Sequence, residues 1–160
     1  MRAELLNPFI RSFNNTVSCF LQNCPQKKSV QVLSSLNHDT NVHIFLGVAG
    51  DLTGTVFLSA GRENALQLAS AMTGLKFTDF DDISASALQE LLNITSGGAA
   101  TEFSQMGINI EITPPTFILG DNIDIRVHFP VISVELFVNG VAIYLNLAVK
   151  KKNGRDKTAG

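Results

Sequence analysis

Two polar residues, Glu90 and Asn93, lie three positions apart in the stretch SALQELLNITSGGAATEF and have side chains suited to catalysis. One carboxylate alone is not the acid and base pair of a glycosidase. The asparagine amide can donate one hydrogen bond and accept another, so it is suited to hold a water molecule. A glutamine positions the attacking water in this way in some nucleotide hydrolases. Because such a pair cannot break a bond alone, we expect a partner that already carries an activated phosphoryl group.

These two residues belong to a predicted helix over roughly residues 80–106, and its two faces differ in composition. At 100° per residue, one side carries an apolar stripe that we expect in the core: Leu88, Leu92, Ala99, Phe103 and Met106. On the other side, Glu90 and Asn93 are surface neighbours. The remaining residues of this second face are small: Ser86, Gly97 and Ala100.

Two glycines interrupt the helical pattern at positions 97 and 98. Each glycine inside a helix costs about 1 kcal/mol relative to alanine, so close approach of another group should offset the cost. The second face is therefore either a packing face for a neighbouring helix or a face onto which a partner docks, with Glu90 and Asn93 reaching into the partner.

The other predicted elements follow from periodicity and turn residues. A helix over 7–23 has Asn7 as its N-cap and Pro8 as its first residue. Strands are predicted over roughly 28–34, 42–50 and 54–60, and a helix that closes at Gly74 follows. Beyond the long helix, Pro114–Pro115 and the dipeptide NG separate further strands. The order predicts an α/β or α+β domain, with helices on a largely antiparallel sheet.

Composition restricts the classes of function. The chain has 160 residues, of which 45 % are hydrophobic and 16 % charged, as in a globular protein. Its net charge of −2 gives no case for nucleic-acid binding. Residues 150–160 carry five Lys or Arg and one Asp, so +4, which leaves −6 on residues 1–149. We expect a single domain over 1–149 and a frayed basic tail over 150–160, with a membrane-binding or partner-binding patch as the alternative.

No other segment offers stronger chemistry. Neither a signal peptide nor a run of membrane-spanning length is visible, so we predict a cytoplasmic protein without membrane contact. Cys19 and Cys24 fit neither a CxxC pair nor a zinc ligand set, and we expect buried or half-buried thiols. His43 alternates with apolar residues and is predicted to face solvent. A phosphate-binding glycine loop, an HExxH motif and a nucleophile elbow are all missing from the sequence, so we expect no metal or cofactor of its own.

Taken in order, five pieces of the sequence resemble the CheC/CheX family of bacterial chemotaxis phosphatases, and CheX more closely than CheC. They are a GDLTG hairpin, an ALxxASAM helix, the SALxExxN helix, an ITPPT turn and the NPF start of the first helix. The resemblance covers about residues 5–149 and does not reach the basic tail. The glycine pair at 97 and 98 departs from relatives that often have one glycine followed by a larger residue.

The resemblance implies a three-layer fold, with long helices against a sheet of six or so strands. It implies removal of the phosphoryl group from the phospho-aspartate of a CheY-like receiver domain. Asn93 would orient the attacking water, Glu90 would contact a lysine of the receiver, and the receiver would supply Mg²⁺. Ser86, Gly97 and Ala100 would lie against the partner. Family members also form homodimers through sheet edges. The alternative is a non-catalytic receiver-binding or flagellar-switch-like module, whereas a small-ligand sensor has little support.

The tetrapeptide Glu-Leu-Leu-Asn occurs a second time at residues 4–7. By the resemblance it is the counterpart of a second motif that CheC proteins carry and CheX proteins have lost. Pro8 disfavours helical geometry at Asn7, which would then be occupied as an N-cap. We therefore expect Glu4 to precede the helix and the first copy to be structural.

Overall fold

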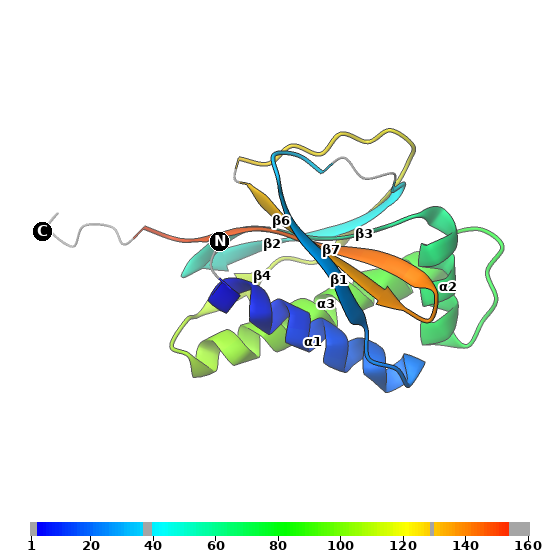
Figure 1. Cartoon of the computed structure of the whole chain (residues 1–160), viewed down its shortest axis with the longest axis horizontal. Coiled ribbons are helices and arrows are strands. Elements are labelled where there is room, and N and C mark those ends of the chain that lie inside the picture. The colour runs from blue at the N-terminus through cyan, green and yellow to red at the C-terminus, as the bar shows by residue number, and fades with distance from the viewer. Residues whose placement is uncertain (1–2, 37–39, 129, 154–160) are drawn as a thin grey trace, which may run out of the picture.

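A seven-stranded sheet lies at the centre of the fold, and three helices pack against it in the computed structural model, which describes residues 3–36, 40–128 and 130–153 (Figure 1). The helices are α1 (Ala3–Leu21), α2 (Arg62–Thr73) and α3 (Asp82–Gln105). The strands are β1 (Gln26–Leu33), β2 (Val42–Gly50), β3 (Leu52–Ala60), β4 (Ile110–Ile112), β5 (Thr116–Leu119), β6 (Val131–Val138) and β7 (Val141–Lys151).

The strand order is β1-β6-β7-β3-β2-β4, with β5 also paired to β2 beyond the end of β4. All of these pairs are antiparallel, as predicted. The NG dipeptide makes the predicted hairpin between β6 and β7, and Asn139 and Gly140 have φ of 50° and 78°. Positive φ at both central residues is the geometry that matches the right-handed twist of paired strands.

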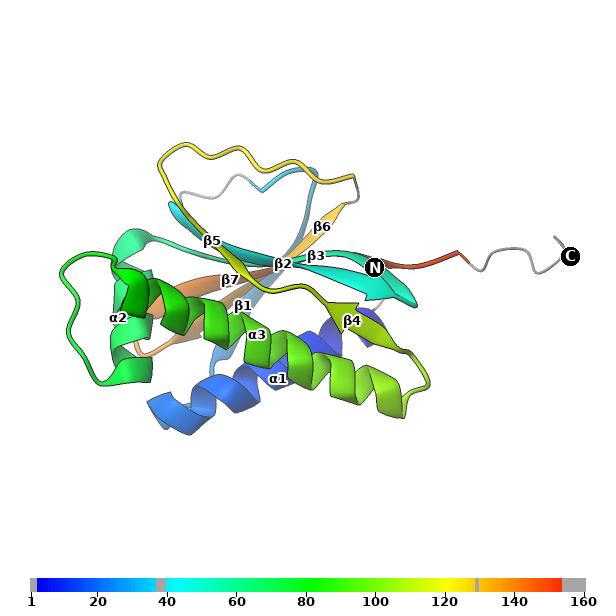
Figure 2. The same cartoon turned by 180° about the vertical axis from the view of Figure 1, so that it is seen from behind.

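The helices form one layer beneath the sheet, with α1 and α3 side by side and α2 near one end (Figures 1 and 2). The main core lies between this layer and the sheet. Alternate residues of β2 point into it, and α1 and α3 each contribute fully buried phenylalanines: Phe9, Phe13 and Phe103. The predicted fold class is thus confirmed, with seven strands in place of six or so.

Loops form the third layer, on the face of the sheet opposite the helices (Figure 1). The amide of Leu36 donates to the carbonyl of Ile125 at 3.1 Å, which ties the segment after β1 to the segment before β6. Leu36 then packs with Phe57, Val131 and Ala148 in a second, smaller core.

His43 lies on this loop-covered face, and the prediction that it faces solvent is wrong. Its side chain is only 2 % exposed, and its Nδ1 lies 2.9 Å from the Ser59 hydroxyl. The alternation along β2 places His43 correctly on the outer face of the sheet. That face is not open to solvent at this position, which the local pattern does not reveal.

The first helix begins at Ala3, so the predicted start at Asn7 and Pro8 is wrong. Both residues lie inside α1. A proline in a helix interior costs about 3 kcal/mol, because it removes a backbone hydrogen bond and crowds the preceding turn. Leu5 and Pro8 are both buried, and burying a leucine side chain contributes about 1.5–3 kcal/mol. Packing of the first turns against the core therefore offsets the proline.

Two smaller expectations also need correction. Cys19 and Cys24 are both free and exposed, rather than buried or half-buried thiols, because one lies on the outward stripe of α1 and the other in the loop after it. The predicted tail begins inside the sheet, since β7 continues through Lys150 and Lys151. The rest of the tail, residues 154–160, lies outside the described residues.

Among the described residues, no helix is both long and apolar enough to pass through a membrane. The cytoplasmic location stays a prediction.

Candidate functional site

The long helix α3 presents one face to the core and one to solvent. Leu88, Leu92, Ala99 and Phe103 are buried as predicted. Met106 is not in the core but 49 % exposed, because the helix ends at Gln105 and Met106 forms its C-cap outside the helical path. The opposite face is accessible and carries the five residues singled out from the sequence: Ser86, Glu90, Asn93, Gly97 and Ala100.

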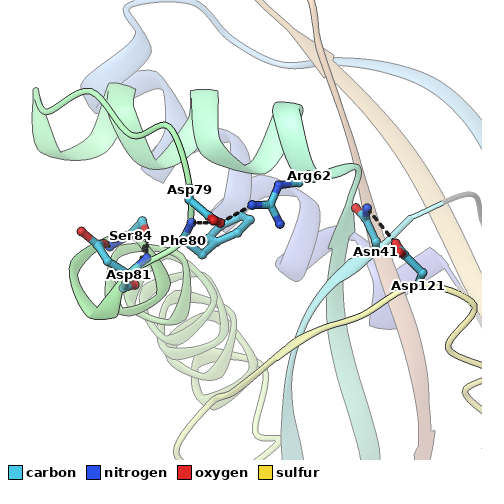
Figure 3. A network of polar contacts seen from close by, with 7 residues as sticks. All are labelled: Asn41, Arg62, Asp79, Phe80, Asp81, Ser84 and Asp121. Carbon is cyan, nitrogen blue, oxygen red and sulfur yellow. Dashed lines mark hydrogen bonds and ion pairs between the residues drawn. The ribbon is translucent and has the colours of Figure 1, made fainter.

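A capping box fixes the beginning of α3. The Asp81 carboxylate accepts a hydrogen bond from the Ser84 backbone amide at 2.8 Å. In return, the Ser84 hydroxyl accepts one from the Asp81 amide at 2.9 Å (Figure 3). These hydrogen bonds, the one from the Ser84 backbone above all, lower the pKa of Asp81 below its usual 3.8. Two of the amides at the start of the helix are thereby satisfied by side chains.

The loop before α3 is tied to α2. Arg62, the first residue of α2, pairs with the Asp79 carboxylate, and its guanidinium lies 5.7 Å from the centre of the Phe80 ring (Figure 3). Phe80 in turn packs on Phe117 of β5, with 5.2 Å between the ring centres. The start of α3 is thus held against both α2 and the edge of the sheet.

The other flank of α3 packs against α1, which runs antiparallel to it. The rings of Phe9 and Phe103 meet edge to face with 5.6 Å between their centres. Arg11 pairs with Glu102 at the surface. A Cβ at Gly98 would overlap the Ser12 side chain, so Gly98 gives α1 room to approach. One of the two glycines in α3 is therefore explained by helix packing.

Gly97 has no such explanation within the described part of the chain. A Cβ placed there would meet no atom within 4 Å apart from its own stretch of helix. It lies on the accessible face, one turn beyond Asn93. The two glycines therefore differ, because Gly98 lies at the contact with α1 whereas Gly97 leaves open space beside Glu90 and Asn93. That a partner docks onto this face stays a prediction.

Glu90 is exposed and Asn93 half-buried, three residues apart on the same helix. Among the residues that the structure describes, neither side chain has a hydrogen-bond or ion-pair partner. Both are therefore available to groups outside the chain. The carboxylate can accept hydrogen bonds from a cation or an amide, and the amide can hold a water molecule between its donor and acceptor. The described residues contain no cluster of three His, Cys, Asp or Glu that could hold a metal ion.

Sequence reasoning missed Gln89, which links α3 to the turn between β4 and β5. Its Nε2 donates a hydrogen bond of 2.9 Å to the carbonyl of Pro115. Sequence analysis treated Pro114–Pro115 only as a turn signal. The sequence signal that could have pointed to Gln89 was its position, directly before Glu90 and one helical turn before Asn93.

The first copy of the tetrapeptide is also helical, contrary to the prediction that Glu4 precedes the helix. Glu4 and Asn7 are exposed and three apart on α1, as Glu90 and Asn93 are on α3. The copies differ in their surroundings. The Glu4 carboxylate accepts a hydrogen bond from Lys151 Nζ at 3.2 Å, and Pro8 follows the asparagine. That the first copy is structural stays a prediction.

Comparison with known proteins gives consistent results. A family model described as "Chemotaxis phosphatase CheX" matches residues 42–136. The chain is 29 % identical over 127 residues to a Thermotoga maritima protein named CheY-P phosphatase CheX, covering 79 % of this chain and 82 % of that protein.

Two solved structures share the fold over nearly their whole length. One is a CheC-like superfamily protein from Shewanella sp. PV-4, with a TM-score of 0.85 at 19 % identity, covering 94 % of this chain and 99 % of that one. The other is the complex of CheX with CheY, BeF3 and Mg²⁺ from Borrelia burgdorferi. Its TM-score is 0.80 at 26 % identity, and the match covers 94 % of this chain and 100 % of that one.

Proposed function

The chain belongs to the family of the chemotaxis phosphatase CheX, and from this we propose that it removes the phosphoryl group from the phospho-aspartate of a CheY-like receiver domain. Support comes from the Thermotoga relative named as a CheY-P phosphatase and from the Borrelia CheX that forms a complex with CheY. The observation that carries the proposal is the pair Glu90 and Asn93, which have no hydrogen-bond or ion-pair partner among the described residues and lie on a helix face with open space at Gly97.

In the proposed reaction, the Asn93 amide holds a water molecule in line with the bond between phosphorus and the aspartyl oxygen. Glu90 docks to a lysine of the receiver and fixes the distance between the two proteins. The small side chains of Ser86, Gly97 and Ala100 let the receiver approach the helix closely. An acyl phosphate is already activated, so orienting the water and excluding bulk solvent can supply the acceleration.

The Mg²⁺ ion belongs to the receiver in this proposal. Among the residues described here, no group of three or more His, Cys, Asp or Glu could hold a metal ion. The contribution of the chain is limited to binding the receiver, orienting the water and shielding the site.

A homodimer joined at a sheet edge is part of the same proposal, and we assign the contact to β1. Among the described residues this strand pairs only with β6, which leaves its outer edge without a neighbouring strand there. Val30 and Val32 of β1 are 45 % and 68 % exposed, on the same face of the sheet as the buried core residue Val134. A second copy would cover both the open edge and this apolar strip.

The test is the lifetime of the phosphoryl group on a receiver domain phosphorylated with a small acyl phosphate. We expect the wild-type protein to shorten it and Asn93→Ala to lose at least about a hundredfold of the acceleration, because the water is no longer oriented. Glu90→Ala should raise KM about tenfold, as expected for a lost charge-assisted hydrogen bond. Full activity in both variants would place the site elsewhere.

The chain contains its own control for this experiment. Asn7→Ala removes the same side chain from the first copy of the tetrapeptide and should leave the rate unchanged, because Glu4 is engaged by Lys151. The non-catalytic alternative predicts a different result: complex formation with the receiver but no change in its dephosphorylation by the wild-type protein.

A further inference from the structure

The edge of the sheet beside α3 is interrupted by a rigid turn, Thr113–Thr116, which we call the diproline shoulder. It connects β4 to the first residue of β5, and both of these short strands pair with β2. Thr113 is held to Gly47 of β2 by two hydrogen bonds. Its amide donates to the Gly47 carbonyl at 3.0 Å, and its hydroxyl accepts from the Gly47 amide at 2.7 Å.

Few conformations are open to this segment. Each proline fixes its own φ, and the residue before each proline is restricted to extended geometry. The hydrogen bond from Gln89 Nε2 to the Pro115 carbonyl adds a third anchor, from α3 itself. The shoulder is thus preorganised, and ordering it in a complex would require little loss of conformational entropy.

The shoulder lies along the flank of α3 that carries the catalytic pair. Figure 2 shows the segment between β4 and β5 running beside α3. Gln89 directly precedes Glu90 and is a surface neighbour of Asn93, one turn further along the helix. Pro114 and Thr116 are exposed.

Size explains why the receiver must touch more than the catalytic pair. A specific interface covers roughly 800 Å² on each partner. The five residues on the face of the catalytic pair supply only one carboxylate, one amide and small side chains, although Ile83 and Ile94 of the same helix are exposed beside them. A surface next to the pair has to supply the remaining contact area. Pro114 and Pro115 suit this role, because neither has a backbone N–H that would lose its water on docking.

We propose that the diproline shoulder is a second contact surface for the phosphorylated receiver and that Gln89 is the positioning residue that holds it there. This inference rests on the proposed function. Gln89 acts through the shoulder and not on the reacting atoms, so its loss should weaken docking without slowing the chemical step.

The test compares Gln89→Met with wild type in steady-state dephosphorylation of a receiver domain. Methionine keeps the size and the helix preference of glutamine but cannot donate the hydrogen bond. We expect KM to rise about three- to tenfold with kcat unchanged. Gln105→Met, an exposed glutamine at the end of the same helix, should match wild type in both constants.

A second variant distinguishes the loss of the receiver contact from misfolding of the Gln89→Met protein. Pro114→Asp changes an exposed side chain, leaves Gln89 in place and puts a charge into the proposed contact, so KM should rise here as well. An unchanged KM in both variants, with an active Asn93-dependent wild type, would overturn the inference and leave the proposed function standing. A fall in kcat at constant KM would also overturn it. An inactive wild type would overturn both.

Discussion

At the scale of single residues, the adjacent glycines of α3 show how one sequence feature can have two causes. Gly98 faces Ser12 of α1, and a methyl group there would overlap the Ser12 side chain unless that side chain moved. Gly97 has space for a methyl group and still carries no side chain. Glycine is unfavourable in a helix, and no contact of the described residues requires one at position 97, so Gly97 fits the proposed close approach of a receiver.

Gly97→Ala should therefore change stability and activity in opposite directions. The free energy of unfolding should rise by about 0.5–1 kcal/mol, because alanine fits the helix and restricts the unfolded chain. Dephosphorylation of the receiver should become severalfold slower at low receiver concentration, because the new methyl group projects from the docking face. Urea unfolding and the phosphate assay measure the two effects.

Gly98→Ala is the matched control, and it should gain little or no stability because the methyl group meets Ser12. A Gly97→Ala protein that is more stable and fully active would rule out close approach of a partner at this point.

Residue types and helical spacing were enough to predict that Glu90 and Asn93 are neighbours on the accessible face of α3, because a helix places its residues in a fixed pattern. Gln89 could not be found this way. Its partner Pro115 is 26 positions away, and only the fold brings the two together. The prediction that His43 faces solvent was wrong for a related reason. Strand alternation predicts on which face of a sheet a side chain lies, but not whether distant loops cover that face.

At the scale of elements, the ends of the helices decide how firmly the site is held. The Asp81 and Ser84 capping box begins α3 two turns before Glu90. Its sequence signal, an aspartate before an apolar periodic run, lies within a few residues, so the predicted start near residue 80 was close. The predicted start of α1 was wrong because Pro8 is a strong local signal for the first residue of a helix. The burial of Leu5, which favours an earlier start, depends on the whole core.

The capping box predicts a pH dependence of stability. The hydrogen bond from Ser84 lowers the pKa of Asp81 in the folded protein below 3.8. Its stabilising effect is therefore present above that value and is lost as the pH falls through the lower, folded-state pKa. Asp81→Ala should reduce the midpoint of thermal unfolding by a few degrees at pH 7, and the difference from wild type should shrink below about pH 3.8.

Asp81→Asn provides the comparison, because asparagine also caps helices but does not titrate. It should unfold close to wild type at pH 7. A deficit in Asp81→Ala that stays constant from pH 7 to pH 3 would contradict the assigned role of the carboxylate.

At the scale of the whole molecule, the two edges of the sheet differ. The β1 edge is a single strand of eight residues with a register shift between Lys27 and Ser29, and it carries the exposed side chains of Val30 and Val32. At the other edge, Pro114–Pro115 separates two short strands, and prolines cannot donate to a neighbouring strand. Sequence predicted antiparallel strands in the right places but not which of them is outermost, since strand order depends on pairings between distant segments.

Val32→Lys should weaken the proposed homodimer by at least about tenfold, because the contact is symmetric and each substitution counts twice. Sedimentation velocity over a range of concentrations measures this change. Leu119→Lys, at an exposed apolar residue of the opposite edge strand β5, should leave the association unchanged. If Leu119→Lys separated the subunits and Val32→Lys did not, the interface would lie at the other edge.

If the proposed dimer forms through β1, the difference between the two edges also limits further assembly. Once two copies join through β1, each outward-facing end of the combined sheet is a β4–β5 edge interrupted by prolines. The two prolines remove backbone N–H donors from this end, so we expect growth to stop after a single step. Raising the protein concentration should increase the fraction of dimer and produce no filaments, even though each monomer exposes an apolar strand.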